Sequence, residues 1–344
     1  MGNAVHVKSP LRLGLAGGGT DVSPYRNKYG GYVVNVTISL FAHCNLEITN
    51  RPTEFIAADY GCVDSYDENR VSLNQQRLDL HRAVHRKMVE KYLSGKDPGL
   101  RMITYSDSPP GSGIGASSSL VVSMVAAYVK LFDIRVTRHE IAQIAYTVER
   151  IDCGMSGGMQ DQYAAAFGGF NVMRFNDDKD VMIEPINLPR EIVNEFESRI
   201  LLYYTGRSRT GAKIIEAQVA NTLNGDIVTL NAMHDLKRSA VLMEECLSRG
   251  DLKGALAALT NSWMHKKATA VGITNDHIDK IGAAAIEAGA DGLKISGAGG
   301  GGFMIIVAAP HNRIGVIRAL EPLGGQFYSV NTTVNGVESW KIRA

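Results

Sequence analysis

The sequence predicts an α+β protein of two domains, because of its length and the order of its secondary-structure patterns. The chain has 344 residues, about twice the length of a common single domain. Strand and helix patterns are mixed in both halves, without the strict strand–helix alternation of a doubly wound parallel sheet. A polar stretch near residues 176–191 separates the halves, so we expect domains at 1–188 and 189–344.

The first half contains both strand-like alternation and helical periodicity. Residues 42–49 alternate apolar and polar side chains, as a half-buried strand does. Thr137 and Glu140 have the spacing of a capping box, which marks the start of a helix. The expected elements are strands at 32–38 and 42–49, a helix at 78–95, a strand at 100–105, helices at 117–132, 137–151 and 160–169, and a strand at 171–175.

The second half is expected to begin with a strand and to continue with helices. Its strand lies at 198–206, and three or four amphipathic helices follow between about residues 210 and 288. The remaining expected elements are strands around 293–297 and 303–309, a helix at 311–323 and a closing strand pair.

Composition excludes several classes of function. The net charge is +1, so no charge excess indicates binding to nucleic acid or to a membrane surface. No apolar run is long enough to span a bilayer, and the N-terminal residues lack the apolar core of a signal peptide. The four cysteines are scattered, which is typical of free thiols in a reducing compartment. We therefore expect a cytoplasmic protein, and the sequence leaves open a homodimer.

The segment PPGSGIGASSS, residues 109–119, indicates a phosphate site. Without Cβ atoms, Gly111, Gly113 and Gly115 let backbone N–H groups converge on an anion. The helix expected directly after this loop adds its free amides and its dipole to the attraction. A simple tight turn with a serine cap is the structural alternative.

Two other classes of phosphate loop compare poorly with this segment. A Walker A loop needs a lysine, and residues 109–119 contain none. The dinucleotide fingerprint fits by letter at Gly111, Gly113 and Ala116, with Asp133 as the ribose carboxylate. That fingerprint requires a strand running straight into the first glycine and an acid at the end of the next strand. Residues 106–110 interrupt the entry, and Asp133 falls between two expected helices, so an oxidoreductase is the less favoured alternative.

Two further glycine clusters complete a pattern that resembles the GHMP kinases, the superfamily of galactokinase, homoserine kinase, mevalonate kinase and phosphomevalonate kinase. The first cluster is PLRLGLAGGGTD, residues 10–21, and the third is KISGAGGGGF, residues 294–303. The resemblance spans nearly the whole chain. It implies a ribosomal protein S5 domain 2-like N-terminal domain and a ferredoxin-like C-terminal domain, with ATP in the cleft.

The resemblance also implies site residues. The ATP phosphates are expected at Pro110, Gly111, Ser112, Gly113, Ile114, Gly115, Ala116, Ser117 and Ser118, and the third motif beside them at Ser296, Gly297, Ala298, Gly299 and Gly300. Mg²⁺ is assigned to Ser117 and Glu149, with Ser118 as a near-equal alternative to Ser117. Asp161 matches the aspartate that serves as base in galactokinase, and Arg12 matches the cationic position that holds this base ionised. Asp152 is the alternative base.

The acceptor is expected to be a sugar. Residues 17–21 keep the Thr20–Asp21 pair of galactokinase-like motifs but lack their Glu-His pair, which disfavours galactose. Residues 10–25 instead resemble heptose kinases, which phosphorylate D-glycero-D-manno-heptose 7-phosphate at C1, and fucokinases have a related version. The substrate residues expected on this basis are Gly18, Gly19, Thr20, Asp21, Gly158 and Arg209.

A phosphorylated sugar also needs cations in its pocket, and the candidates are Arg207, Arg209, Lys213 and Lys266. The expected function is therefore an ATP- and Mg²⁺-dependent sugar 1-kinase that makes a heptose 1,7-bisphosphate for surface polysaccharide. Its expected partners are ATP and a small sugar phosphate. The alternatives are another sugar 1-kinase, an isoprenoid kinase or decarboxylase of the superfamily, a dinucleotide-dependent oxidoreductase and a sensor that has lost catalysis.

Overall fold

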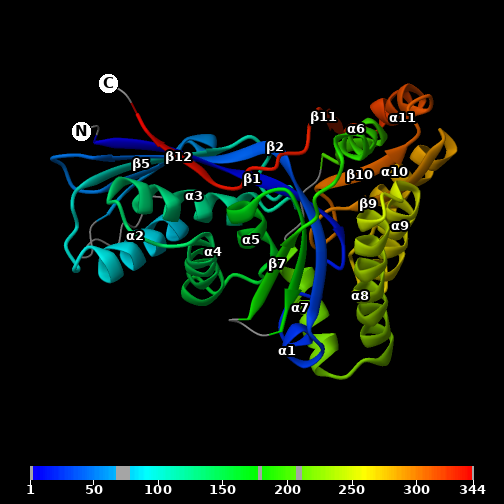
Figure 1. The fold of residues 1–344 in the computed structure, drawn as a ribbon, viewed down its shortest axis with the longest axis horizontal. Helices are drawn as coiled ribbons and strands as arrows, with labels where there is room; N and C mark the ends of the chain where they lie inside the picture. The colour runs from blue at the N-terminus through cyan, green and yellow to red at the C-terminus, as the bar shows by residue number, and fades with distance from the viewer. Residues whose placement is uncertain (1–2, 67–77, 177–179, 207–210, 343–344) are drawn as a thin grey trace.

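The computed structural model describes residues 3–66, 78–176, 180–206 and 211–342, and it has two sheets with helices packed against them (Figure 1). The larger sheet has eight strands in the order β12-β1-β2-β5-β3-β4, with β6 paired to β2 and β7 to β6. Its strands are β1 (Ala4–Ala16), β2 (Gly31–Ile48), β3 (Glu54–Ala57), β4 (Cys62–Ser65), β5 (Leu100–Ser106), β6 (Phe170–Phe175), β7 (Val181–Pro185) and β12 (Glu338–Lys341).

Strand β2 joins the two strands that the sequence predicts at 32–38 and 42–49. Its pairing with β1 jumps from Pro10↔Phe41 to Leu11↔Ile38, so Ser39 and Leu40 have no partner on β1. Ser39 contacts the C-terminal segment instead, since its amide donates to the carbonyl of Asn331 at 2.8 Å. The break in the sequence pattern is therefore a bulge within one strand.

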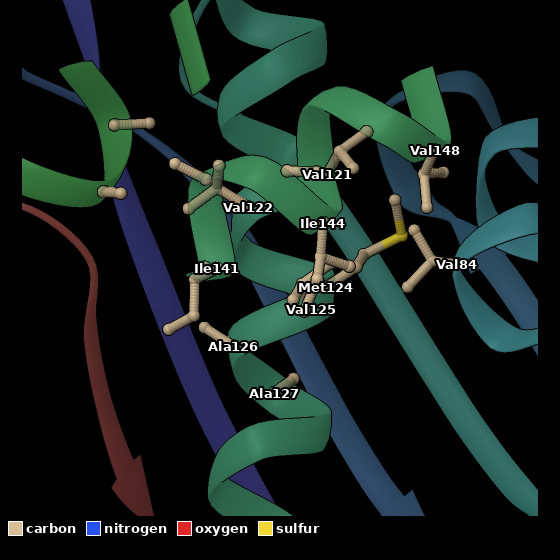
Figure 2. Close-up of a cluster of buried hydrophobic side chains, with 14 of the residues drawn as sticks. Val84, Val121, Val122, Met124, Val125, Ala126, Ala127, Ile141, Ile144 and Val148 are labelled. Carbon is tan, nitrogen blue, oxygen red and sulfur yellow. The ribbon is translucent and has the colours of Figure 1, made fainter. Parts of the chain in front are cut away.

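Helices cover one face of this sheet and bury its apolar side chains. They are α2 (Asp79–Tyr92), α3 (Ala116–Leu131), α4 (Arg138–Tyr146) and α5 (Gln160–Phe167). Helix α3 is apolar on nearly all sides because α2, α4, α5 and the sheet surround it, and Figure 2 shows Val121, Met124 and Val125 within this cluster. The capping box of Thr137 and Glu140 is present at the start of α4, as predicted. A π-helical turn, Thr147–Asp152, extends α4 toward the site described below.

The second half has a four-stranded antiparallel sheet in the order β11-β8-β10-β9. Its strands are β8 (Ile200–Tyr204), β9 (Ala290–Ile295), β10 (Phe303–Ala308) and β11 (Gln326–Tyr328). Strand β10 reads as a continuous apolar run because both its faces are buried: Phe303 and Ile305 face one core cluster, and Met304 and Ile306 face another. The helices of this half are α6 (Arg190–Arg199), α7 (Gly211–Leu223), α8 (Ile227–Ser248), α9 (Leu252–Lys267), α10 (Asp276–Glu287) and α11 (Arg313–Leu320).

The two halves share one buried core, which fixes the walls of the cleft between them. Leu13 of β1 and Val36 of β2 belong to the same apolar cluster as Met243 of α8, Leu259 of α9 and Phe303 of β10. The chain then returns to the first sheet, where β12 pairs antiparallel with β1 (Figure 1). The closing strands β11 and β12 consequently pair with different sheets rather than with each other. The domain boundary at residue 188 stays a prediction.

Candidate active site

A cavity of about 270 Å³ lies between the halves, and all three glycine clusters reach it. Strand β1 and the loop after it form one wall, and a short helix α1 (Tyr25–Tyr29) closes that loop. The loop between β5 and α3 and the start of α5 form a second wall. Helices α7 and α9, strand β9 and the loop after β9 close the cavity from the other half. The cavity is thus assembled from segments that are far apart in the sequence.

The second and third glycine motifs touch through their backbones. The amide of Phe303 donates to the carbonyl of Ser112 at 2.9 Å. An added Cβ on Gly113 would lie 2.8 Å from the carbonyl oxygen of Ser296, and the φ of Gly113 is +78°. A side chain at this position would therefore clash and would also strain the backbone. Gly113 therefore allows the two motifs to approach each other this closely.

The second motif leads into the N-terminus of α3, which begins at Ala116 with Gly115 as its N-cap and no side-chain cap. The first amides of the helix are therefore available to an anion, as in other helix-terminal phosphate sites. Most of the motif lines the cavity, but two members do not. Pro110 is exposed, and Ile114 is fully buried in the shared core. The carbonyl of Ile114 accepts from the amide of Arg12 at 3.0 Å, so this residue anchors the loop to β1.

Arg12 and Asp161 line the cavity and form a hydrogen-bonded ion pair. Atoms Nε and Nη2 of Arg12 lie 2.7 and 2.6 Å from Oδ1 of Asp161. Arg12 also donates from Nη1 to the carbonyl of Gly113 and to the hydroxyl of Ser296, at 3.0 and 3.1 Å. One guanidinium therefore contacts the second motif, the third motif and the carboxylate.

Glu149 lies on the π-helical turn, and its carboxylate is buried under the start of α3. Oε1 accepts from the hydroxyl of Ser117 at 2.8 Å, and Oε2 accepts from that of Ser118 at 2.7 Å. Ser118 is 1% exposed and also bonds Gln162, whereas Ser117 is partly exposed. Asp152, the alternative base, does not line the cavity and pairs with Lys87 at 2.8 Å.

The Ser117–Glu149 pair fits a magnesium ion. A hydroxyl oxygen and a carboxylate oxygen are ligands of the kind that Mg²⁺ prefers, and Oγ of Ser117 lies 2.8 Å from Oε1 of Glu149. Within the described residues no group of three or more His, Cys, Asp or Glu side chains could hold a metal. Two oxygens are enough for Mg²⁺, which takes one or two protein ligands and completes its shell with phosphate and water.

Asp21 forms the other polar wall of the cavity. It is 1% exposed and accepts from the amides of Gly19 and Gln160, each at 3.1 Å. Gly158 packs so closely that an added Cβ would lie 1.9 Å from Oδ2 of Asp21. Thr20 is buried away from the cavity, and its hydroxyl bonds the carbonyls of Gly17 and Tyr32.

The remaining residues expected from the sequence fall into three groups. Gly18, Gly19, Lys266, Ser296, Gly297, Ala298 and Gly299 line the cavity. Gly300 does not line it, and its amide donates to the carbonyl of Ile273. Arg207 and Arg209 lie outside the described residues, and Lys213 does not line the cavity.

The structure adds cavity residues to which the sequence assigned no role, among them Gly14, Arg150, Gln160, Gln218 and Lys294. The sequence feature that could have identified Lys294 is its position as a lysine within an apolar strand, directly before a run of glycines. Burial, together with the charges of Lys266 and Arg12, lowers the pKa of Lys294 to about 7. Gln218 lies in an ordinary amphipathic helix, and nothing in its local sequence distinguishes it.

The oxidoreductase interpretation requires Asp133 near the glycine loop, and the structure places it elsewhere. Asp133 lies just beyond the C-terminal end of α3, whereas the glycine loop lies directly before its N-terminal end. A helix of this length, 16 residues, spans about 24 Å. The side chain of Asp133 is 79% exposed, so it does not belong to the cavity.

Comparisons with known proteins show the family and the fold of the chain. Residues 79–169 match the GHMP kinases N terminal domain, and residues 243–321 match the GHMP kinases C terminal domain. The chain is 40% identical to D-glycero-alpha-D-manno-heptose 7-phosphate kinase of Campylobacter jejuni, over 98% of this chain and 99% of that protein.

Solved structures show the same fold. A D-glycero-D-manno-heptose 1-phosphate kinase from Bacteroides thetaiotaomicron superimposes with a TM-score of 0.80 at 36% identity, covering 99% of this chain and 100% of that one. Lactococcus lactis galactokinase, at 19% identity, shares the fold with a TM-score of 0.76 over 98% and 95% of the two chains. The expected fold class is confirmed. The chain therefore belongs to the GHMP kinases and is a phosphotransferase related to the heptose phosphate kinases.

Proposed function

We propose that this chain transfers the γ-phosphoryl group of ATP to the C1 hydroxyl of D-glycero-D-manno-heptose 7-phosphate. The observation that carries this proposal is the Arg12–Asp161 pair, which lies between the glycine loop and the polar wall around Asp21. The 40% identity to a heptose 7-phosphate kinase supports the choice of sugar. The product, a heptose 1,7-bisphosphate, would serve surface polysaccharide synthesis in the cytoplasm.

The residues of the cavity divide the work of phosphoryl transfer. The amides of 111–118 bind the phosphates of ATP, and Arg12 offsets the charge that builds on the group in transit. Asp161 orients the C1 hydroxyl and accepts its proton. One of its oxygens is fixed by Arg12, and the other, Oδ2, accepts no hydrogen bond within the described residues. That oxygen is free to meet the acceptor.

Ser117 and Glu149 would hold Mg²⁺, which neutralises phosphate charge when it is bound. Both serines line the cavity, and Ser117 is favoured over Ser118 because it is partly exposed whereas Ser118 is 1% exposed. Both oxygens of Glu149 accept from hydroxyl groups at the start of α3, and these two hydrogen bonds fix the orientation of the carboxylate.

A coupled ADP-release assay tests the proposal, with ATP, Mg²⁺ and a panel of sugars. The panel contains heptose 7-phosphate, heptose 1-phosphate, unphosphorylated heptose, galactose, fucose and mevalonate. We expect the highest kcat/KM with heptose 7-phosphate and a new anomeric phosphate in the ³¹P spectrum of the product. One heptose kinase relative is named for a 7-phosphate and the other for a 1-phosphate, so the panel contains both sugars. A product whose new phosphate is on any carbon other than C1 would overturn the assignment of C1.

A further inference from the structure

Four buried polar side chains meet where the loop after β1 faces helices α7 and α9. Asp21 comes from that loop, Gln160 is the first residue of α5, Gln218 lies on α7 and Lys266 lies on α9. Their exposed fractions are 1%, 9%, 3% and 4%. Each half of the chain contributes two of the four, and all of them line the cavity.

Lys266 is held in place but keeps unused donors. Its Nζ donates to Oε1 of Gln218 at 2.8 Å, and Nε2 of Gln218 donates to the carbonyl of Gly19 at 3.2 Å. An ammonium group has three N–H donors, and no second acceptor for Nζ is found among the described residues. Burial lowers the pKa of Lys266 to about 8, and the charge of Asp21 opposes this shift. The group therefore carries its charge at neutral pH with donors that are not satisfied.

Gln160, in contrast, has a hydrogen-bond acceptor that lacks a donor. Its backbone amide and its Nε2 both donate to Asp21, at 3.1 Å each. These bonds fix the orientation of the side-chain amide, and they leave Oε1 buried without a hydrogen-bond partner. Buried oxygens of this kind are nearly always bonded in a completed site. A ligand that donates a hydrogen to Oε1 would complete this one.

The cavity wall formed by these residues thus presents a hydrogen-bond acceptor without a donor beside a hydrogen-bond donor without enough acceptors. Asp21 and Gln160 Oε1 only accept, whereas the Lys266 ammonium only donates. A hydroxyl group does both, and neighbouring hydroxyl groups on one carbon chain can satisfy both kinds of partner at once. A carboxylate or phosphate ligand would satisfy Lys266 but would offer no hydrogen to Gln160.

We propose that Lys266, positioned by Gln218, is a specificity-determining residue that donates to a hydroxyl oxygen of a vicinal diol while Gln160 and Asp21 accept from the diol. This inference rests on the proposed function, because the diol belongs to the sugar that is phosphorylated. It assigns recognition of the acceptor to both halves of the chain.

The direct test compares Lys266→Met with Lys267→Met, the adjacent lysine, which does not line the cavity. We expect Lys266→Met to lower kcat/KM for the sugar by about 10- to 100-fold, the effect of losing a charged hydrogen bond. The KM for ATP should stay within about twofold in both variants. Gln218→Leu, which removes the acceptor that holds Lys266, provides the same readout at about three- to tenfold if the first variant does not fold.

Mono-deoxy sugars separate recognition from a purely structural role. In the wild-type enzyme one deoxy analogue should lose about as much kcat/KM as Lys266→Met loses, and that analogue should lose nothing further in the variant. The inference about Lys266 would be overturned if every analogue lost the same kcat/KM in both enzymes, or if the sugar KM were unchanged in Lys266→Met. Wild-type turnover of the sugar would still support the proposed function in that case. Absence of wild-type turnover on every sugar would overturn both.

Discussion

Arg12 and Asp161 are 149 residues apart in sequence, yet two guanidinium nitrogens lie within 2.7 Å of one carboxylate oxygen. Arg12 is 4% exposed, so this charge pair is screened little by water. The same guanidinium bonds Gly113 and Ser296. Arg12 therefore connects the proposed base to the second and the third glycine motifs.

Replacement of Arg12 should impair the chemical step more than substrate binding. We expect Arg12→Met to lower kcat by about 10²–10³-fold, because the charge that develops in the transition state loses its buried partner. Initial rates at saturating ATP and sugar measure this change. Arg101→Met is the matched control, since Arg101 is 47% exposed on β5 and pairs with acids at the surface. Similar losses in both variants would contradict the role given to Arg12.

Glu149→Gln should lower the apparent affinity of the enzyme for Mg²⁺. The amide keeps the size of the side chain but removes the charge that a divalent ion needs, so we expect at least about tenfold more Mg²⁺ for half-maximal activity. Asp152→Asn is the control, because Asp152 is paired with Lys87 outside the cavity. A metal titration that is unchanged in Glu149→Gln would remove this residue from the site. A large loss in Asp152→Asn would revive Asp152 as the base.

Gly158→Ala should damage the acceptor wall. The new methyl group would lie 1.9 Å from Oδ2 of Asp21, so the carboxylate must move. We expect kcat/KM for the sugar to fall about 10- to 100-fold with the KM for ATP nearly unchanged. Gly315→Ala in α11 is the control, because the nearest atom to its new methyl group is a carbonyl oxygen at 3.6 Å. An unchanged sugar KM in Gly158→Ala would place the acceptor elsewhere.

Stability of the ligand-free protein should depend on the ionisation of Lys294. The pKa of Lys294 falls from 10.5 to about 7 on folding, so the folded protein binds fewer protons than the unfolded chain between these values. The unfavourable effect of the buried charge is complete below about pH 7 and fades as the pH rises toward 10.5. Lys294→Met lacks this effect, so its stability relative to the wild type should decrease between pH 7 and 9.5. Denaturant midpoints at several pH values measure the difference, and a difference that is constant with pH would contradict a lowered pKa.

The sequence predicted the elements whose patterns are local. The capping box at Thr137, the apolar run of β10 and the glycine loop before α3 are each visible within a few residues. Helix α6 was missed because Pro189 and the polar residues after it resemble a linker, and only Phe196 buries its side chain there. The single strand β2 appeared as two, because the bulge at Ser39 and Leu40 interrupts its alternation.

The site residues that belong to recognisable sequence motifs could be predicted. Arg12, Glu149 and Asp161 were found through the family pattern, and the structure brings all three to one cavity. Thr20 matches the pattern equally well but supports a turn. Gln218 and Gln160 could not be selected, because their relation to Gly19, Asp21 and Lys266 exists only after the two halves pack together.

The central claim is that Asp161 activates the C1 hydroxyl of a sugar for attack on ATP. The most direct measurement is single-turnover phosphorylation of heptose 7-phosphate by wild-type enzyme and by Asp161→Ala at saturating substrates. We expect the rate to fall by about 10²–10⁴-fold, with retained thermal stabilisation by ATP. A rate for Asp161→Ala within about tenfold of the wild type would contradict the account.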